Sequence, residues 1–119
     1  MKLKLEEKKL DLDGRIYTLH VNMSVLEKVQ EAHGGDFHEL MNLSPSVLEA
    51  EVLAAMLNDW AEDQGWDDQW TARMIQKRFS MAMIHDLDVW GMFIRSVTPA
   101  NKGSAEKPGA TEDKSESGN

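Results

Sequence analysis

Residues 10 to 21 read LDLDGRIYTLHV, and this stretch constrains the fold more than any other part of the sequence. Asp13-Gly14 stands between two segments of alternating apolar and polar residues, which predicts a β-hairpin with a two-residue type I′ turn. The register of that turn pairs Lys8 with Leu19, Leu10 with Tyr17 and Leu12 with Arg15. A two-stranded hairpin is marginal in water, so helices or another chain must cover one of its faces.

The hairpin register places the apolar side chains on a common face. They are Leu10, Leu12, Tyr17, Leu19 and Val21. Leu3 and Leu5 have the wrong parity for this face. A bulge or a break within residues 6 to 9 would reconcile them with it.

Apolar residues at helical spacing predict helices after the hairpin. Ser24 begins a capping-box pattern for the first helix, Asn22 is the alternative cap, and Gly34-Gly35 ends it. Ser44-Pro45 opens the longest helix, with serine as N-cap and proline at the first helical position. The apolar positions of this longest helix are Val47, Leu48, Val52, Leu53, Met56, Leu57 and Trp60.

Two further helical segments are expected before residue 98. Thr71 caps one that runs through Phe79, and the other runs from about Met81 to Val97. No proline or glycine divides them, so they are either separate or one bent helix. The sequence therefore predicts an α+β fold, in which residues 1 to 98 form a single small domain. A short N-terminal β-hairpin precedes a bundle of about four to five small helices.

Residues 99 to 119 have a different composition. They contain no aromatic residue and no Leu, Ile, Val or Met. Such a segment cannot bury enough apolar surface to offset the entropy lost on ordering. We therefore expect a disordered C-terminal tail.

Three of the four tryptophans lie within residues 60 to 70, WAEDQGWDDQW. If Gly65 ends the longest helix in the left-handed conformation, Trp66 packs back on the last turn, against Trp60 or Ala61. Packing at the helix end then explains most of the tryptophans in this stretch without a binding role. A stacking or sugar-binding role is the alternative.

The charge balance bears on the class of partner. Lys and Arg number 13 and Asp and Glu number 21, a net charge of −8. This negative field disfavours nucleic-acid binding, and it also favours solubility. No apolar run approaches the roughly 18 residues that span a bilayer, so no membrane association is expected. The absence of cysteine excludes disulfides and thiolate metal sites.

Catalytic and metal-binding patterns were sought along the whole sequence. His33, Asp36, His38 and Glu39 lie close together, but the two histidines are five residues apart across Gly-Gly. A helical zinc site needs a spacing of four, so helix-end capping or solvation is the preferred interpretation. The sequence has no phosphate-binding loop and no nucleophile elbow. We expect neither an enzyme nor a cofactor, a metal or a small-molecule substrate.

The final helical region is rich in methionine. It holds Met74, Met81, Met83 and Met92, and Trp90 lies on the apolar stripe of the last predicted helix. Methionine is flexible and polarizable, and it recurs on surfaces that adapt to partners. These five residues are candidates for protein binding, and core packing is the alternative.

The order of these parts resembles the tail assembly chaperones of long-tailed bacteriophages, over about residues 2 to 98. The resemblance is carried by the turn at Asp13-Gly14, the strand aromatic Tyr17 and the Asn22-Met23 entry to a helix. That helix ends in the sequence EAHGG, residues 31 to 35. The later GWDDQWTARMIQKRF resembles the entry to that family's penultimate helix.

The resemblance implies a non-catalytic assembly factor in the cytoplasm of a host bacterium, encoded by a phage or a prophage. It implies binding to the tape measure protein, which stays soluble while tail tube subunits polymerise around it. Contact with the tail tube protein and self-association are also implied, as is a longer frameshifted form in many members. The alternatives are a small protein-binding adaptor and a structural subunit of the virion.

Overall fold

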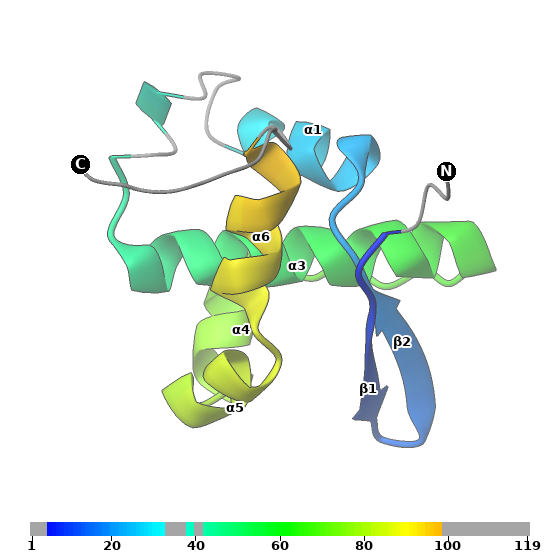
Figure 1. Cartoon of the computed structure of the whole chain (residues 1–119). Coiled ribbons are helices and arrows are strands. Elements are labelled where there is room, and N and C mark those ends of the chain that lie inside the picture. Colours follow the sequence, from blue (N-terminus) through cyan, green and yellow to red (C-terminus); the bar gives the residue numbers. More distant parts are fainter. Residues whose placement is uncertain (1–4, 33–37, 40–41, 99–119) are drawn as a thin grey trace.

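The computed structural model describes residues 5–32, 38–39 and 42–98. Within these ranges the chain has the predicted α+β fold, with one antiparallel hairpin and five helices (Figure 1). The elements are β1 (Lys8–Leu12), β2 (Arg15–Leu19), α1 (Met23–Glu31), α3 (Pro45–Gln64), α4 (Ala72–Arg78), α5 (Met81–Asp86) and α6 (Val89–Val97). The helix end expected at Gly34-Gly35 and the tail expected at 99–119 lie outside the described residues.

The hairpin has the predicted turn and register. Leu10 pairs with Tyr17. Asp13 and Gly14 have φ angles of 54° and 87°, as a type I′ turn requires. Leu5 precedes β1 and is 47% exposed, so the strand begins only after the residues of conflicting parity.

α3 runs through the middle of the molecule, and β2, α1, α4 and α6 all contact it (Figure 1). It begins at Pro45 with Ser44 as N-cap, as predicted. Its buried apolar residues are Leu48, Ala50, Val52, Leu53, Ala54, Ala55, Met56, Leu57 and Ala61. The alanines widen the buried surface beyond the predicted stripe, so this helix is covered on most of its circumference.

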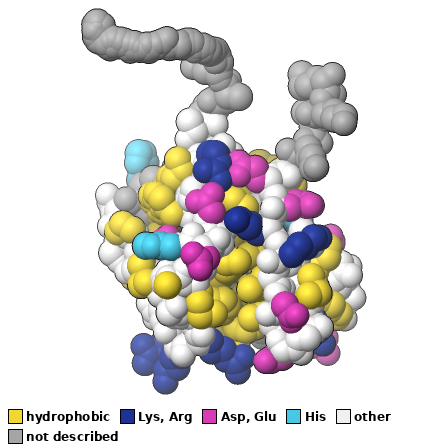
Figure 2. Space-filling model, turned by 60° about the horizontal axis from the view of Figure 1, so that its bottom comes forward, with side chains coloured by type: hydrophobic (Ala, Val, Ile, Leu, Met, Phe, Trp, Pro, Cys, Tyr) yellow, Lys and Arg dark blue, Asp and Glu magenta, His cyan; other side chains and the backbone are white. Residues whose placement is uncertain are grey.

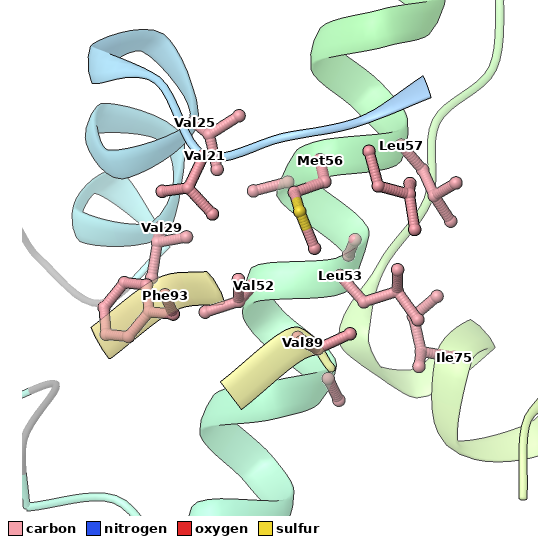
Figure 3. Close-up of a cluster of buried hydrophobic side chains, with 14 of the residues drawn as sticks. Val21, Val25, Val29, Val52, Leu53, Met56, Leu57, Ile75, Val89 and Phe93 are labelled. Atoms are coloured by element: carbon pink, nitrogen blue, oxygen red, sulfur yellow. The ribbon is translucent and has the colours of Figure 1, made fainter. Parts of the chain in front are cut away.

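The hydrophobic core forms where the other elements meet α3 (Figure 3). Its labelled members are Val21, Val25, Val29, Val52, Leu53, Met56, Leu57, Ile75, Val89 and Phe93. All of them are buried. Burial of a side chain of this size stabilises a fold by about 1.5–3 kcal/mol, so this contact surface is the main source of stability.

Side-chain caps set the starts of α1 and α4. Asn22, and not Ser24, caps α1, because its Oδ1 accepts a hydrogen bond from the Val25 N–H at 2.7 Å. Thr71 caps α4 as predicted, and its Oγ1 accepts from the Met74 N–H at 3.2 Å. Each cap satisfies an N–H group that has no partner within its helix.

The single helix expected from Met81 to Val97 is wrong, because the chain forms two helices there, α5 and α6. Asp88 separates them with a φ angle of 55°, in the left-handed region. Aspartate adopts this conformation more readily than most residues other than glycine. Its carboxylate also accepts a hydrogen bond from Arg95 at 2.6 Å. Ser80 caps α5, so α4 and α5 are separate as well.

The end of α3 agrees with the predicted glycine ending. Gly65 has a φ angle of 76°, and the Trp66 N–H donates to the Ala61 carbonyl oxygen at 2.8 Å. This is the Schellman pattern. Of the two neighbours expected for Trp66, Ala61 is reached through this backbone hydrogen bond. The Trp66 ring packs on Tyr17, and the Trp60 ring packs on His20.

We predict that Gly65→Val destabilises the domain by more than about 1 kcal/mol, because a β-branched residue resists the left-handed conformation. No atom lies within 4 Å of the position that a Cβ would take, so the cost comes from the backbone alone. Gly65→Asn is the matched control, since asparagine tolerates positive φ and should lose less stability. Equal urea midpoints for the wild type and Gly65→Val would contradict this account of the helix end.

Candidate protein-binding groove

A hollow of about 480 Å³ opens between the tip of the hairpin and the junction of α4 with α5. The hairpin contributes Leu12, Asp13, Arg15 and Tyr17 to its walls. The segment after α3 contributes Trp70, Arg78, Phe79 and Met83. Figure 2 views the molecule with this end brought forward and shows hydrophobic side chains gathered near the centre of that face. We call this hollow the hairpin groove.

Aromatic rings in mutual contact form the floor of the hairpin groove. Tyr17 is 2% exposed and Phe79 is 8% exposed. The Trp70 ring lies between them, with its centroid 6.5 Å from that of Tyr17 and 6.4 Å from that of Phe79. Both pairs are edge-to-face, an arrangement that fixes the rings beyond what burial alone achieves. The floor is therefore apolar and rigid.

Asp68 ties the loop after α3 to the hairpin. It accepts a hydrogen bond from the Tyr17 hydroxyl and another from Arg15 Nη1 at 2.9 Å. The Arg15 guanidinium also lies over the Trp66 ring, 4.3 Å from its centroid. These contacts hold one wall of the hairpin groove in place.

The same contacts shift two pKa values. The hydrogen bond from Tyr17 lowers the pKa of Asp68 below its ordinary value of 3.8, burial opposes this, and Arg15 lowers it further. Burial raises the pKa of the Tyr17 hydroxyl, and its hydrogen bond to Asp68 raises it further. At neutral pH the carboxylate is therefore ionised and the hydroxyl keeps its proton as a donor.

Arg78 stands at the rim on the opposite wall. Its guanidinium lies over the Trp70 ring, 5.5 Å from the centroid, which is a cation–π distance. Among the described residues no carboxylate forms an ion pair with Arg78. The rim thus presents a positioned cation with hydrogen-bond donors available to a partner.

The structure separates the five residues proposed from the sequence. Met83 lines the hairpin groove and is 42% exposed. Met81 is exposed on the same short helix but outside the groove lining, and Met74 is half-buried on α4. Trp90 is half-buried and lines a different hollow, at the start of α6. Met92 belongs to the core.

The candidacy of Met92 for protein binding is therefore wrong, and the alternative of core packing holds, since only 3% of this residue is accessible. The break at Asp88 starts a new helix whose buried residues are Val89, Met92 and Phe93. A charged residue at position 92 would be buried without a partner, so substituting it would test the fold and not binding.

Sequence reasoning missed most of the groove. Arg15 lies on the hairpin, whereas Trp70, Arg78 and Phe79 follow α3, and only the packing of both segments on α3 brings them together. One signal was present. The hairpin register placed Tyr17, which carries a polar hydroxyl, on the apolar face, and a buried tyrosine usually finds a hydrogen-bond partner.

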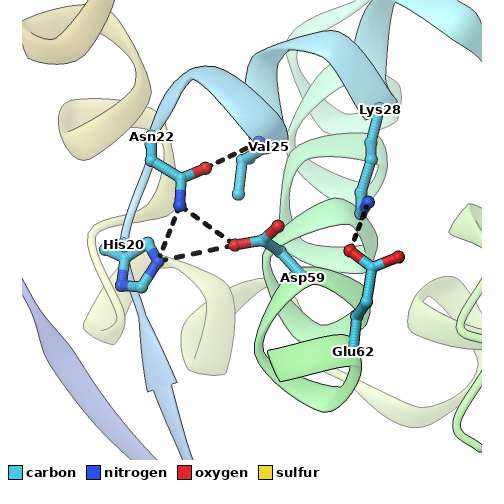
Figure 4. Close-up of polar contacts among 6 residues, drawn as sticks. All are labelled: His20, Asn22, Val25, Lys28, Asp59 and Glu62. Carbon is cyan, nitrogen blue, oxygen red and sulfur yellow. Dashed lines mark hydrogen bonds and ion pairs between the residues drawn. The ribbon is translucent and has the colours of Figure 1, made fainter. Parts of the chain in front are cut away.

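A second polar cluster lies where the hairpin leads into α1 (Figure 4). Asn22 Nδ2 donates to Asp59 Oδ2 at 3.0 Å and lies 3.1 Å from His20 Nε2. Burial raises the pKa of Asp59, but hydrogen bonds from Ser24 and Asn22 outweigh it, so the net shift is downward. Because Asn22 also caps α1, this cluster fixes the start of that helix against α3.

No group of three or more His, Asp or Glu side chains within the described ranges could hold a metal ion. His33 and Asp36 of the sequence cluster lie outside those ranges. None of the described helices has both the length and the apolar character to cross a bilayer. Comparisons with protein families, curated proteins and solved structures found no match to this chain.

We predict that Asp68→Asn lowers the free energy of unfolding at neutral pH by roughly 1 kcal/mol, the net scale of one hydrogen bond, because asparagine keeps one acceptor oxygen. Folding lowers the pKa of Asp68, so its contribution is fully present above the ordinary value of 3.8 and is lost as the pH falls through the folded value. Urea titrations of both proteins across this range should show their stabilities converging in acid. A difference that stays constant with pH would contradict the assigned role of the carboxylate.

Proposed function

We propose that this protein is a non-catalytic tail assembly chaperone of a long-tailed phage or prophage. It binds the tape measure protein in the host bacterial cytoplasm and keeps it soluble while the tail tube assembles. Contact with the tail tube protein and self-association are part of the proposal. The observation that carries it is the hairpin groove, a hollow with an aromatic floor and a methionine in its lining, together with the family resemblance of the sequence.

The composition of the groove supports binding to apolar helices. A rigid floor of Tyr17, Trp70 and Phe79 offers a preorganised surface, which lowers the entropy lost on binding. Met83 at the rim can change rotamer to fit different side chains. A long helical partner presents many similar but unequal segments, so this combination of fixed and adaptable contacts suits it.

The net charge of −8 supports the same function in another way. A chaperone that covers apolar surface must keep the complex from associating further. Like charge on the outward faces of successive bound copies opposes aggregation. The exposed apolar residues near the groove then meet the partner and not one another.

The test is co-expression with the tape measure protein encoded in the same gene cluster. Wild-type protein should raise its soluble fraction, and Met83→Glu should reduce the rescue. The introduced glutamate would stand three residues after the Ser80 cap, the spacing of a capping box, so α5 should be retained. Circular dichroism and the melting temperature check this.

Met81→Glu is the matched control. It makes the same charge change on the same helix but outside the groove lining, so it should rescue nearly as well as the wild type. Absence of any rescue or pull-down by the wild type would overturn the chaperone proposal. Detection of the protein in purified mature particles would favour a virion subunit instead.

A further inference from the structure

The charge of α4 differs from that of the whole chain. Its seven residues, Ala72–Arg78, include Arg73, Lys77 and Arg78 and no acid. The chain as a whole carries −8, so this helix is a basic patch on an acidic protein. Arg78 is the member of this patch that lines the hairpin groove.

We propose that the hairpin groove selects a partner helix that carries a carboxylate beside its apolar stripe, and that Arg78 binds this carboxylate. The inference rests on the proposed function, since the helix is taken to be a segment of the tape measure protein. Apolar residues at helical spacing would lie on the accessible lining residues Leu12, Trp70 and Met83. The acid, one turn away or less, would reach the guanidinium at the rim.

Arg78 is suited to this role by its surroundings. The cation–π contact with Trp70 places the guanidinium at the rim, and a guanidinium can bind a carboxylate through two parallel hydrogen bonds. The other arginine of the groove, Arg15, is already neutralised by Asp68. The only other charged residue of the lining is Asp13, an acid that would not attract a carboxylate. Arg78 is thus the cation of the groove lining that is left to recognise an acid.

Other occupants fit the groove less well. Residues 99–119 have no Leu, Ile, Val, Met or aromatic side chain to fill an apolar hollow. Residues 1–4, MKLK, would bring two lysines toward Arg78. A second copy would need an exposed apolar stripe on one helix. The exposed large apolar residues within the described ranges are instead spread over four segments: Leu5, Ile16, Met23, and Met81 with Met83.

The experiment uses fluorescently labelled synthetic peptides of about 18 residues, long enough to hold a helix. They share a leucine and alanine stripe and differ only in two flanking positions, which carry Glu, Gln or Lys. Anisotropy titrations with the full chain should show the Glu peptide binding about tenfold more tightly than the Gln peptide, and the Lys peptide more weakly still. The preference should shrink in high salt.

Arg78→Gln should reduce the preference for Glu over Gln to less than about twofold, while binding of the Gln peptide changes little. Arg78→Lys keeps the charge but loses the planar fork, so it should retain only part of the preference. Arg73→Gln is the matched control, because it removes the same charge from α4 outside the groove lining. It should keep the full preference.

Three outcomes would overturn the proposal. The first is equal affinity of the wild type for the Glu and Gln peptides. The second is an equal loss of the preference for Glu in Arg73→Gln and Arg78→Gln. The third is that no peptide binds and the wild type forms an oligomer that Met83→Glu dissociates. The last outcome would assign the groove to a second copy. Co-expression distinguishes failure of this proposal from failure of the proposed function. If the wild type and Arg78→Gln both keep the tape measure protein soluble to the same extent, the chaperone function stands and selection of an acid by Arg78 is rejected.

Discussion

Burial of α3 is the interaction on which the rest of the structure depends. The helices α4, α5 and α6 have seven, six and nine residues, too few to be stable alone in water. A two-stranded hairpin has the same weakness. β2, α1, α4 and α6 nevertheless hold their places, because each covers part of the apolar surface of α3. The fold is therefore a set of marginal elements made stable by one long central helix.

The hairpin groove follows from this arrangement. Buried Tyr17 and Leu19 anchor the hairpin in the core, and its tip extends beside α4 and α5. Asp68, in the loop after α3, accepts hydrogen bonds from the hairpin residues Arg15 and Tyr17. The hairpin wall of the groove is therefore held by hydrogen bonds as well as by packing. The junction at Ser80 then places a short, exposed methionine helix at the opposite rim. A rigid apolar floor and an adaptable edge are properties that helix-binding surfaces use.

Charge is distributed unevenly over the molecule. The net charge of −8 belongs to the whole chain and opposes aggregation of the complexes. The basic helix α4 acts only near the groove, because surface charges are screened beyond about 8 Å at physiological ionic strength. Arg78 lies where this local field meets the apolar floor. On the proposed function, general repulsion keeps complexes apart while the groove retains selectivity for its partner helix.

The sequence by itself determined the features that depend on neighbouring residues. Three examples are the turn at Asp13-Gly14, the Thr71 cap and the Gly65 ending. Each involves groups only a few residues apart, so it could be predicted without knowledge of the tertiary structure. Tertiary structure decided the groove, since the Tyr17 hydroxyl meets a carboxylate 51 residues away only after the hairpin packs on α3, the helix that precedes the Asp68 loop. It also decided that Met92 is buried, because methionine suits core and surface alike and only packing selects between them.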